Sequence, residues 1–363
     1  MALEFLHVKE EDAVRVNHER LHDFITRLFA SFALPENEAK MVADVLVYAD
    51  LKGIDSHGVS NAIQMIYVPR LREGLINPQP KPSIVHETAT TALVDGDGGM
   101  GMVPGHFAMN LAIQKAKEYG TAFVTVRNSR HFGAAGYYAC MALPHDMIGW
   151  SMTNTGPIVL PTFGRQPMLG TNPIAVVAPT KEEPPFIMDF ATSTVAFQKI
   201  AIAGIVGAPI PTGWAADQEG RPTTDPKVAR ESRALLPLGG TRESGSHKGY
   251  SLAVLVDVLC GVLSGAGYSA ALDGQAGHFF GAMRIDAFRP ADEFKAMMDE
   301  MIRALRNSEK AVGEERIYVA GEPDFETEQE RRAHGIPLHK DVVAFLRRTA
   351  EEQKVAFTLT DPE

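Results

Sequence analysis

The sequence of 363 residues predicts an α/β protein in which helices pack on a mixed β-sheet. The first observation behind this prediction is that short runs rich in β-branched and aromatic residues alternate with helical stretches in the middle of the chain. The second is that residues 1–75 have helical periodicity. The third is a segment with three prolines, residues 77–82, which marks the first domain boundary.

Two helices are predicted before this boundary. Residues 13–31 carry apolar side chains at close to helical spacing, so we expect one helix over this whole segment. The second helix begins at Pro35, because proline is favoured in a first turn, and it ends before Gly53. Its apolar residues follow the i, i+3, i+4, i+7 pattern: Val42, Val45, Leu46 and Ala49.

After the boundary, strands and helices are predicted in alternation. The strands are expected at 91–95, 121–126, 148–153, 174–178 and 186–190, and the helices at 106–119, 133–143 and 194–204. A long helix follows at 246–263, and an amphipathic helix over 291–310 carries a methionine stripe that we expect to pack in the core. We interpret the charged segment 322–332 as a helix with a solvated face.

The charge balance argues against a nucleic acid or a membrane as partner. The chain has 35 Lys and Arg against 45 Asp and Glu, a formal net charge of −10, whereas both partners need a basic face. Only two cysteines are present, which excludes a disulfide framework and a cysteine-based zinc site. The N-terminal residues lack the features of a signal peptide, and no apolar run reaches the ~20 residues of a membrane span. We therefore expect an acidic, cytoplasmic protein.

A glycine motif at residues 96–101 matches G-x-G-x-x-G, follows a predicted strand and precedes a predicted helix, as in a dinucleotide-binding fingerprint. However, Asp95 and Asp97 would place negative charge where a pyrophosphate has to lie. The acidic residue expected about twenty positions later is at best Glu118, which lies within a helix. We therefore interpret these residues as a glycine-built turn and reject a Rossmann fold.

A second motif, His18-Glu-Arg-Leu-His22, has the spacing of a zinc-binding helix. No third ligand stands out in the sequence, so we interpret the motif as a solvated helix face and predict no metal site. A metal-dependent hydrolase is the alternative that depends on it.

Polar and ionisable residues concentrate where predicted helices and strands end. His57 follows Ser56 in a predicted turn and precedes a glycine, which suits an imidazole presented from a turn. His131 lies just after a predicted strand, where α/β proteins place ligands. Asp189 is a lone carboxylate at the end of an apolar strand. The glycine-rich segment 239–249 opens the long helix and has the donors and the lysine of an anion site.

These segments resemble the type II malate/L-lactate dehydrogenase family, which includes sulfolactate and ureidoglycolate dehydrogenases, diketogulonate reductase and piperideine-2-carboxylate reductase. The similarity lies in five motifs in matching order: DLKGIDSHGVS, VRNSRHFGAAGYYA, LGTNPIAVVAPT, MDFATS and LPLGG…SHKGYSLAVLVDVL. It implies hydride transfer between NAD or NADP and C2 of a small 2-oxo or 2-hydroxy acid, by a homodimer. It also implies a non-Rossmann fold of the malate/L-sulfolactate dehydrogenase type. Reduction of a cyclic imino acid on the same fold is the alternative that this resemblance leaves open.

With this resemblance, we expect two domains. A helical domain is expected from residues 1–78 with 287–363. A mixed-sheet domain, which binds NAD(P) and carries the catalytic residues, is expected over 79–286.

By the same resemblance, His57 matches the histidine of the family's Ser-His-Gly motif, after Ser56, and is taken as the proton donor to the substrate. Asp189 matches the carboxylate that partners it, since an adjacent carboxylate stabilises an imidazolium. His131 matches a second histidine to which some members assign the acid/base role. The residues that match cofactor contacts are His131, Gly133, Thr155, Gly170, Thr171, Asn172, Phe190, Ala191, Thr192, His247, Lys248, Gly321, Glu322 and Pro323.

One position departs from the family. Many relatives have an arginine four residues after the Ser-His-Gly histidine, where it can hold the substrate carboxylate, whereas this chain has Asn61. We expect Lys52, Arg70 or Arg130 to replace it, or the substrate to differ from malate and lactate. A protein that binds its ligand without catalysis is a further alternative, if Asn61 marks lost activity.

The sequence does not distinguish NAD from NADP. Arg127, Arg130 and Lys181 are candidates for contact with the 2′-phosphate of NADP.

Overall fold

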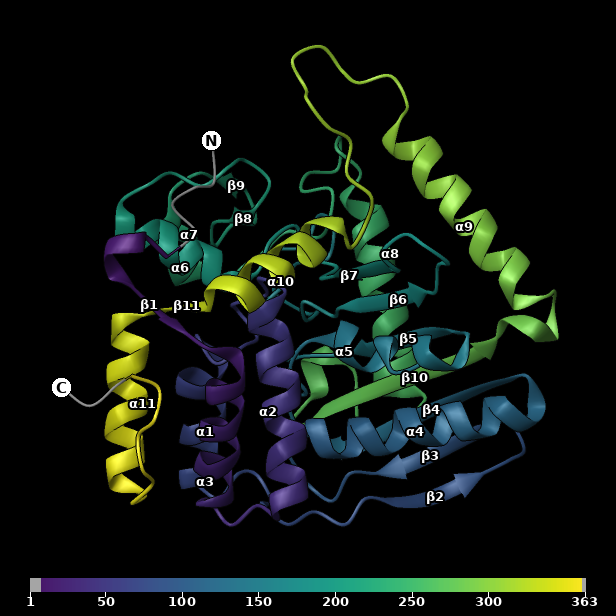
Figure 1. Ribbon diagram of the computed structural model, residues 1–363. Coiled ribbons are helices and arrows are strands. Elements are labelled where there is room, and N and C mark those ends of the chain that lie inside the picture. Colours follow the sequence, from purple (N-terminus) through teal and green to yellow (C-terminus); the bar gives the residue numbers. More distant parts are fainter. Residues whose placement is uncertain (1–7, 361–363) are drawn as a thin grey trace.

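The computed structural model describes residues 8–360 and has the predicted mixed sheet (Figure 1). Seven strands form this sheet, in the spatial order β2 (Ser83–Glu87), β3 (Thr91–Asp95), β4 (Thr121–Ser129), β10 (Ala276–Arg284), β5 (Met147–Thr153), β6 (Ile174–Ala178) and β7 (Phe186–Phe190). Strands β3 and β4 are parallel, and every other neighbouring pair of this sheet is antiparallel. Because a Rossmann fold needs a parallel sheet, its rejection is confirmed.

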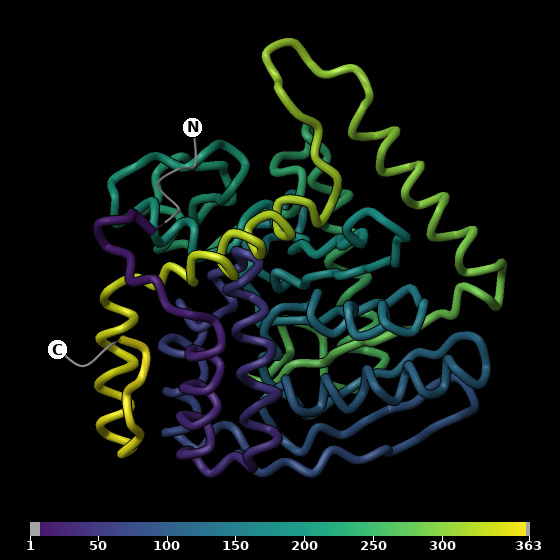
Figure 2. Tube along the Cα trace, viewed as in Figure 1, coloured from purple at the N-terminus to yellow at the C-terminus, as the bar shows by residue number. Residues whose placement is uncertain are grey.

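Helices surround the sheet and form most of the two ends of the chain (Figures 1 and 2). They are α1 (His18–Ala30), α2 (Glu36–Leu51), α3 (Val68–Arg72), α4 (Met102–Tyr119), α5 (Ala135–Cys140), α6 (Phe197–Val206), α7 (Pro226–Ser232), α8 (Ser246–Val256), α9 (Ala291–Arg306), α10 (Glu322–His334) and α11 (Lys340–Glu352). All the strands and helices predicted between residues 91 and 263 are confirmed, although several bounds differ by a few residues.

The two faces of the sheet belong to two different hydrophobic clusters. On one face, α4 and α5 pack against side chains such as Val124 and Ala175. On the opposite face, α8 and the π-helical turn that continues it (Asp257–Val262) pack against Met152 and Phe279. This division follows from the strand geometry, in which successive side chains point to opposite faces.

The helix predicted over 13–31 is wrong in its first turn. Ala13–Val16 form strand β1, which pairs antiparallel with β11 (Ile336–His339), and the helix begins only at His18. Asn17 caps this helix, because its side-chain oxygen accepts two N–H groups of the first turn at 2.9 and 3.1 Å. The pairing joins segments near the two ends of the chain, and a local sequence pattern cannot predict a contact between such distant segments.

The N- and C-terminal segments therefore lie side by side, with α11 next to α1 in Figure 1. The largest hydrophobic cluster includes both Leu46 of α2 and Val124 of the sheet. The division into two domains stays a proposal, with one domain made of residues 1–78 and 287–363 and the other of residues 79–286. Residues 1–7 and 361–363 of the first domain lie outside the described part of the chain.

A further hydrophobic cluster lies between α6, α7 and strand β8 (Ala215–Ala216), which pairs with β9 (Pro222–Thr223). Its members include Ile200, Ala229 and Leu235. Figure 1 shows this small region at the upper left of the view. The gap between this cluster and the main one is where the candidate site lies.

The methionine stripe of α9 is not in the core, so that prediction is wrong. Met297 and Met301 are 53% and 43% exposed, and the buried residues of α9 are Asp299 and Ile302. Helical spacing specifies an apolar face but not what covers it. Within residues 8–360, no helix is both long and apolar enough to cross a membrane.

Candidate active site

A turn after α2 presents His57. The N–H of His57 donates to the carbonyl of Ile54 at 2.9 Å, which closes the turn. The Oγ of Ser56 lies 2.8 Å from Nδ1 of His57, so the hydroxyl and the ring are hydrogen-bonded. Among residues 8–360, Nε2 of His57 has no hydrogen-bond partner. This nitrogen is therefore the position at which the ring can exchange a proton with a ligand.

The carboxyl group of Asp50 supports this turn from inside the protein. It accepts the N–H of Val59 at 2.7 Å and the hydroxyl of Ser60 at 3.1 Å. Gly58 packs directly on it, since a Cβ at position 58 would lie 2.0 Å from Oδ1 of Asp50. Burial raises the pKa of Asp50 to about 8. The position of the histidine thus depends on a neighbouring glycine and on a fully buried carboxyl group.

The glycine-rich residues 96–101 hold the backbone of the segment that carries His131. Three of their N–H groups donate to the carbonyls of residues 127, 128 and 131 at 2.8 to 3.1 Å. Because these N–H groups are already hydrogen-bonded to backbone carbonyls, they are not available to bind a phosphate group. The interpretation of the motif as a structural turn is consistent with these bonds.

Nδ1 of His131 is an acceptor of two hydrogen bonds. The hydroxyl of Tyr67 lies 2.6 Å from it, and the N–H of Gly133 lies 3.3 Å from it. Because a backbone N–H only donates, Nδ1 is unprotonated and the neutral ring carries its proton on Nε2. Tyr67 ends a π-helical turn (Ile63–Tyr67) and belongs to no motif that the sequence analysis singled out.

The two imidazoles lie face to face. The ring centres of His57 and His131 are 5.5 Å apart, and their planes differ by 17°. Burial lowers the pKa of His57 to about 4. Burial, then the charges of His57 and Arg70, lower the pKa of His131 well below its ordinary value. Two stacked positive charges repel each other, so the pair takes up one proton far more readily than two.

Asp189 lies near the end of β7, and its Oδ2 accepts the N–H of Gly136 at 2.7 Å. A Cβ at position 136 would lie 2.7 Å from this oxygen and 3.1 Å from the hydroxyl of Tyr48, so the close approach needs a glycine. Burial raises the pKa of Asp189 to about 6, and the carboxylate of Asp324 adds to this effect. Among the described residues, Asp189 is hydrogen-bonded to α5 and not to His57.

One cavity of about 820 Å³ brings these groups together. Ala135 of the main hydrophobic cluster and Val195 of the α6–α7 cluster both line it, so the cavity lies between the two clusters. The expected site residues that line this cavity are Ser56, His57, His131, Gly133, Thr155, Thr171, Asp189, Phe190 and Ala191. The structure therefore brings together chain segments that are far apart in the sequence.

Several expected cofactor contacts lie outside this lining: Gly170, Asn172, Thr192, His247, Lys248, Gly321, Glu322 and Pro323. Two of them support the wall from behind. The side chain of Asn172 is buried, accepts the N–H of Thr155 at 3.1 Å and donates to the carbonyl of Ala253 at 3.0 Å. The hydroxyl of Thr192 donates to the carbonyl of Thr171 at 3.1 Å.

The segment 239–249 opens α8, as expected from its glycines. The N–H groups of Gly245 and Ser246 donate to carbonyls of the same segment at 3.1 and 3.0 Å, and His247 lies 3.1 Å from a guanidinium nitrogen of Arg242. Glu322 is held by Arg306 and by the N–H of Val319. These contacts are internal to the protein.

Of the three cations expected to replace the missing arginine, Arg70 is the one whose charged group has no partner among residues 8–360. The ammonium of Lys52 binds Glu328 at 2.7 Å. The guanidinium of Arg130 donates to two backbone carbonyls at 2.9 and 3.2 Å. Arg70 does not line the cavity, but its charge contributes to the lowered pKa of His131.

The cations that line the cavity are Lys199 and Arg233, and the sequence analysis missed both. Lys199 lies within a predicted helix and Arg233 in a stretch with no assigned element, so neither carried a local signal. Arg127, Arg130 and Lys181 are not part of the lining, and Arg127 instead bonds Asp95 at 3.2 Å.

The segment His18–His22, which has the spacing of a zinc-binding helix, lies on α1 and has a different role in the structure. Nε2 of His22 lies 2.8 Å from Oδ1 of Asp44 on α2, so this histidine joins two helices. In the part of the chain that the structure describes, no group of three or more His, Cys, Asp or Glu side chains is arranged to hold a metal ion.

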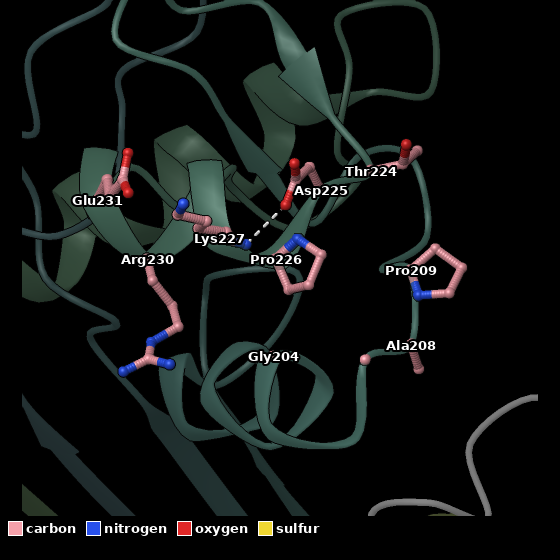
Figure 3. Close-up of a pocket in the computed structure, with 10 residues that line it drawn as sticks. Gly204, Ala208, Pro209, Thr224, Asp225, Pro226, Lys227, Arg230 and Glu231 are labelled. Atoms are coloured by element: carbon pink, nitrogen blue, oxygen red, sulfur yellow. Dashed lines mark hydrogen bonds between the residues drawn. The ribbon is translucent and has the colours of Figure 1, made fainter.

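A second cavity, of about 930 Å³, lies on the α6–α7 region (Figure 3). Lys227, Arg230 and Glu231 of α7 line it together with Asp225, which caps α7 by accepting the N–H of Lys227 at 2.8 Å. No residue that carries the family resemblance lines this cavity, so we place the chemistry in the other one.

Comparisons with known proteins give one consistent result. Residues 16–347 match the family model described as malate/L-lactate dehydrogenase. The chain is 44% identical to a malate dehydrogenase of Pyrococcus abyssi, over 94% of this chain and 95% of that protein. The crystal structure of malate dehydrogenase from Entamoeba histolytica has a TM-score of 0.92 and 38% identity, over 95% of this chain and 99% of that one. A more distant structure, delta1-piperideine-2-carboxylate reductase from Pseudomonas syringae, has a TM-score of 0.81 and 28% identity, over 93% and 100%.

Proposed function

The chain belongs to the malate/L-lactate dehydrogenase family, and we propose that it uses NAD or NADP to interconvert a small 2-oxo acid and the corresponding 2-hydroxy acid. As a member of this family, it is an oxidoreductase that acts on the CH–OH group of hydroxy acids. The identity of the acid and of the nicotinamide cofactor belongs to the proposal.

The observation that carries the proposal is that His57, His131 and Asp189 line one cavity, in which the two imidazole rings are stacked. Reduction of a 2-oxo acid places negative charge on the oxygen at C2, and a positioned acid must supply a proton there. Imidazole is suited to this task because its ordinary pKa lies near neutral pH.

We assign His57 as the proton donor. Nδ1 of His131 accepts from Tyr67 and Gly133, which keeps that ring in the neutral Nε2–H form, a very weak acid. His57 has an Nε2 without a partner among the described residues. An anionic substrate and the ionised carboxyl of Asp189 in the same cavity both favour a protonated His57, which opposes the effect of burial on its pKa.

The cavity suits a dinucleotide in size and in polar groups. Its volume of about 820 Å³ falls within the range of roughly 300–1,000 Å³ that is usual for ligand sites. Thr155, Thr171 and Ser193 are among its polar lining residues. Bound NADH or NADPH supplies the reducing equivalent, while the residues of this chain orient the substrate and hold the proton.

We assign the substrate carboxylate to Arg70, which lies outside the cavity lining but near enough to His131 for its charge to lower the pKa of that ring. Position 61 holds asparagine, which has no charge, and the charged groups of Lys52 and Arg130 are engaged with other protein groups. The guanidinium of Arg70 has no partner among residues 8–360 and acts electrostatically on His131.

The test is a substrate panel. Oxaloacetate, pyruvate, phenylpyruvate and Δ1-piperideine-2-carboxylate are each mixed with the protein and with NADH or NADPH, and the absorbance of the reduced nicotinamide is followed. We expect turnover of at least one 2-oxo acid. Turnover of the cyclic imine alone would support the second candidate, which the similarity to the Pseudomonas reductase favours. Cofactor binding without turnover of any compound would contradict the proposed activity.

We further propose a homodimer in the cytoplasm. The apolar face of α9, with Met297, Met301 and Leu305 each 43 to 53% exposed, supports association with a second copy. The cysteines, Cys140 and Cys260, are free thiols, as in proteins of reducing compartments. Light scattering of the purified protein tests the first proposal, with a monomer mass as the contrary result.

A further inference from the structure

The charged residues that line the candidate cavity come from different parts of the fold. Its two carboxyl groups, Asp189 and Asp324, belong to β7 and α10. Its two cations, Lys199 and Arg233, belong to the α6–α7 region. A ligand that extends from the carboxyl groups to the α6–α7 region therefore meets negative charge in one part of the cavity and positive charge in another.

The two cations come from adjacent elements that are packed together. Lys199 lies in the first turn of α6, and Arg233 follows the last residue of α7, with a φ of +49°. The guanidinium of Arg233 lies 5.2 Å from the ring centre of Phe197, which also lines the cavity. Stacking on an aromatic ring orients a guanidinium and leaves its N–H groups available to an anion.

Neither cation is neutralised by the protein. Among residues 8–360, the ammonium of Lys199 and the guanidinium of Arg233 have no hydrogen-bond or ion-pair partner. By contrast, Lys52, which follows α2, binds Glu328 at 2.7 Å. Two uncompensated positive charges in one part of a cavity attract an anionic ligand, and phosphate is the anion that a dinucleotide offers.

We propose that Lys199 and Arg233 bind phosphate groups of the nicotinamide dinucleotide, which places its nicotinamide near His57 and His131. This inference rests on the proposed use of NAD or NADP. The reverse orientation would put phosphates beside Asp189 and Asp324, where like charges repel. The arrangement gives the α6–α7 region a function, because this region supplies the two cations that line the cavity.

The experiment compares binding of NADH and NADPH by fluorescence titration of the unchanged protein and of variants. Lys199→Gln and Arg233→Gln are each expected to raise Kd on the order of tenfold, because each loses a charge-assisted hydrogen bond. Lys227→Gln and Arg230→Gln are matched controls with the same charge change in the neighbouring cavity of Figure 3, and we expect their Kd to stay within about twofold.

Comparing the change in Kd for NADH with the change for NADPH identifies which phosphate group the two cations bind. Equal weakening of NADH and NADPH assigns the cations to the diphosphate, and a larger loss for NADPH assigns them to the 2′-phosphate. Both results support the proposal. Unchanged Kd in both Lys199→Gln and Arg233→Gln would overturn it, as would equal weakening in the two control variants. If the unchanged protein binds neither dinucleotide, the proposed function itself is wrong, and this inference is lost with it.

Discussion

Replacement of Asp50 by asparagine tests whether a buried carboxyl group governs the stability of the turn that carries His57. The side chain of Asp50 is fully buried and accepts bonds from Val59 and Ser60. Burial, with a smaller effect of the Asp55 carboxylate, raises its pKa from 3.8 to about 8. Asparagine has nearly the same shape as the protonated acid and keeps an oxygen that can accept the Val59 N–H.

The sign of the effect follows from proton binding. Between pH 3.8 and about 8 the folded protein holds a proton on Asp50 that the unfolded chain has released, so the free energy of unfolding falls as the pH rises. The slope is about 1.4 kcal/mol per pH unit for one group, which amounts to about 4 kcal/mol between pH ~5 and pH ~8. The Asp50→Asn variant has no titratable proton at this position. We therefore expect its free energy of unfolding to fall by about 4 kcal/mol less over this pH range than that of the unchanged protein.

Urea unfolding at both pH values, for the unchanged protein and for Asp50→Asn, measures the difference. Other buried carboxyl groups such as Asp189 titrate in both proteins, and their effect cancels in the comparison. Asp292→Asn, at a side chain that is 83% exposed, serves as the control and should leave the decline unchanged. Parallel curves for Asp50→Asn and the unchanged protein would refute the reasoning, because they would show that Asp50 has the same pKa folded and unfolded.

Three further predictions concern activity. His57→Ala is expected to lower kcat by about 10²- to 10⁴-fold, and a loss of less than about tenfold would move the proton-donor role to His131. Gly136→Ala introduces a Cβ 2.7 Å from Oδ2 of Asp189, so we expect lower kcat/KM in steady-state assays, while Gly156→Ala, which meets no atom within 4 Å, should keep it. Arg70→Gln is expected to raise KM for the 2-oxo acid by about tenfold with a smaller change in kcat. An unchanged KM for Arg70→Gln would contradict its assignment to the carboxylate.

Many of the helices and strands were predicted from the sequence, and the main elements that were missed have a common cause. Strands such as β3 and β6 are short apolar runs between turn residues, and a local pattern is enough to find them. Strand β10, which lies between β4 and β5, was missed because its glycines and His278 are not residues typical of a strand. Its neighbours on both sides stabilise it, and Nδ1 and Nε2 of His278 bond Thr153 and Ser129 at 2.8 and 2.7 Å.

The same distinction applies to the site. Ser56, His57, His131 and Asp189 were predicted as site residues from their types and motifs, and all four line the cavity. Tyr67, Lys199 and Arg233 were not predicted, because their places beside His131 or in the cavity lining depend on contacts between distant segments of the chain. A helix or strand pattern depends on a few neighbouring residues, so it can be recognised in the sequence.

The sequence alone was sufficient to identify the chemical groups, the local elements that carry them and the absence of a parallel dinucleotide-binding sheet. Only the tertiary structure decided that residues 57, 131 and 189 line one cavity, that N–H groups of glycines in residues 96–101 are hydrogen-bonded within the protein, and that Lys199 and Arg233 line the same cavity. The reason is that strand pairing, burial and charge compensation depend on which distant segments meet, and this is settled when the whole chain packs.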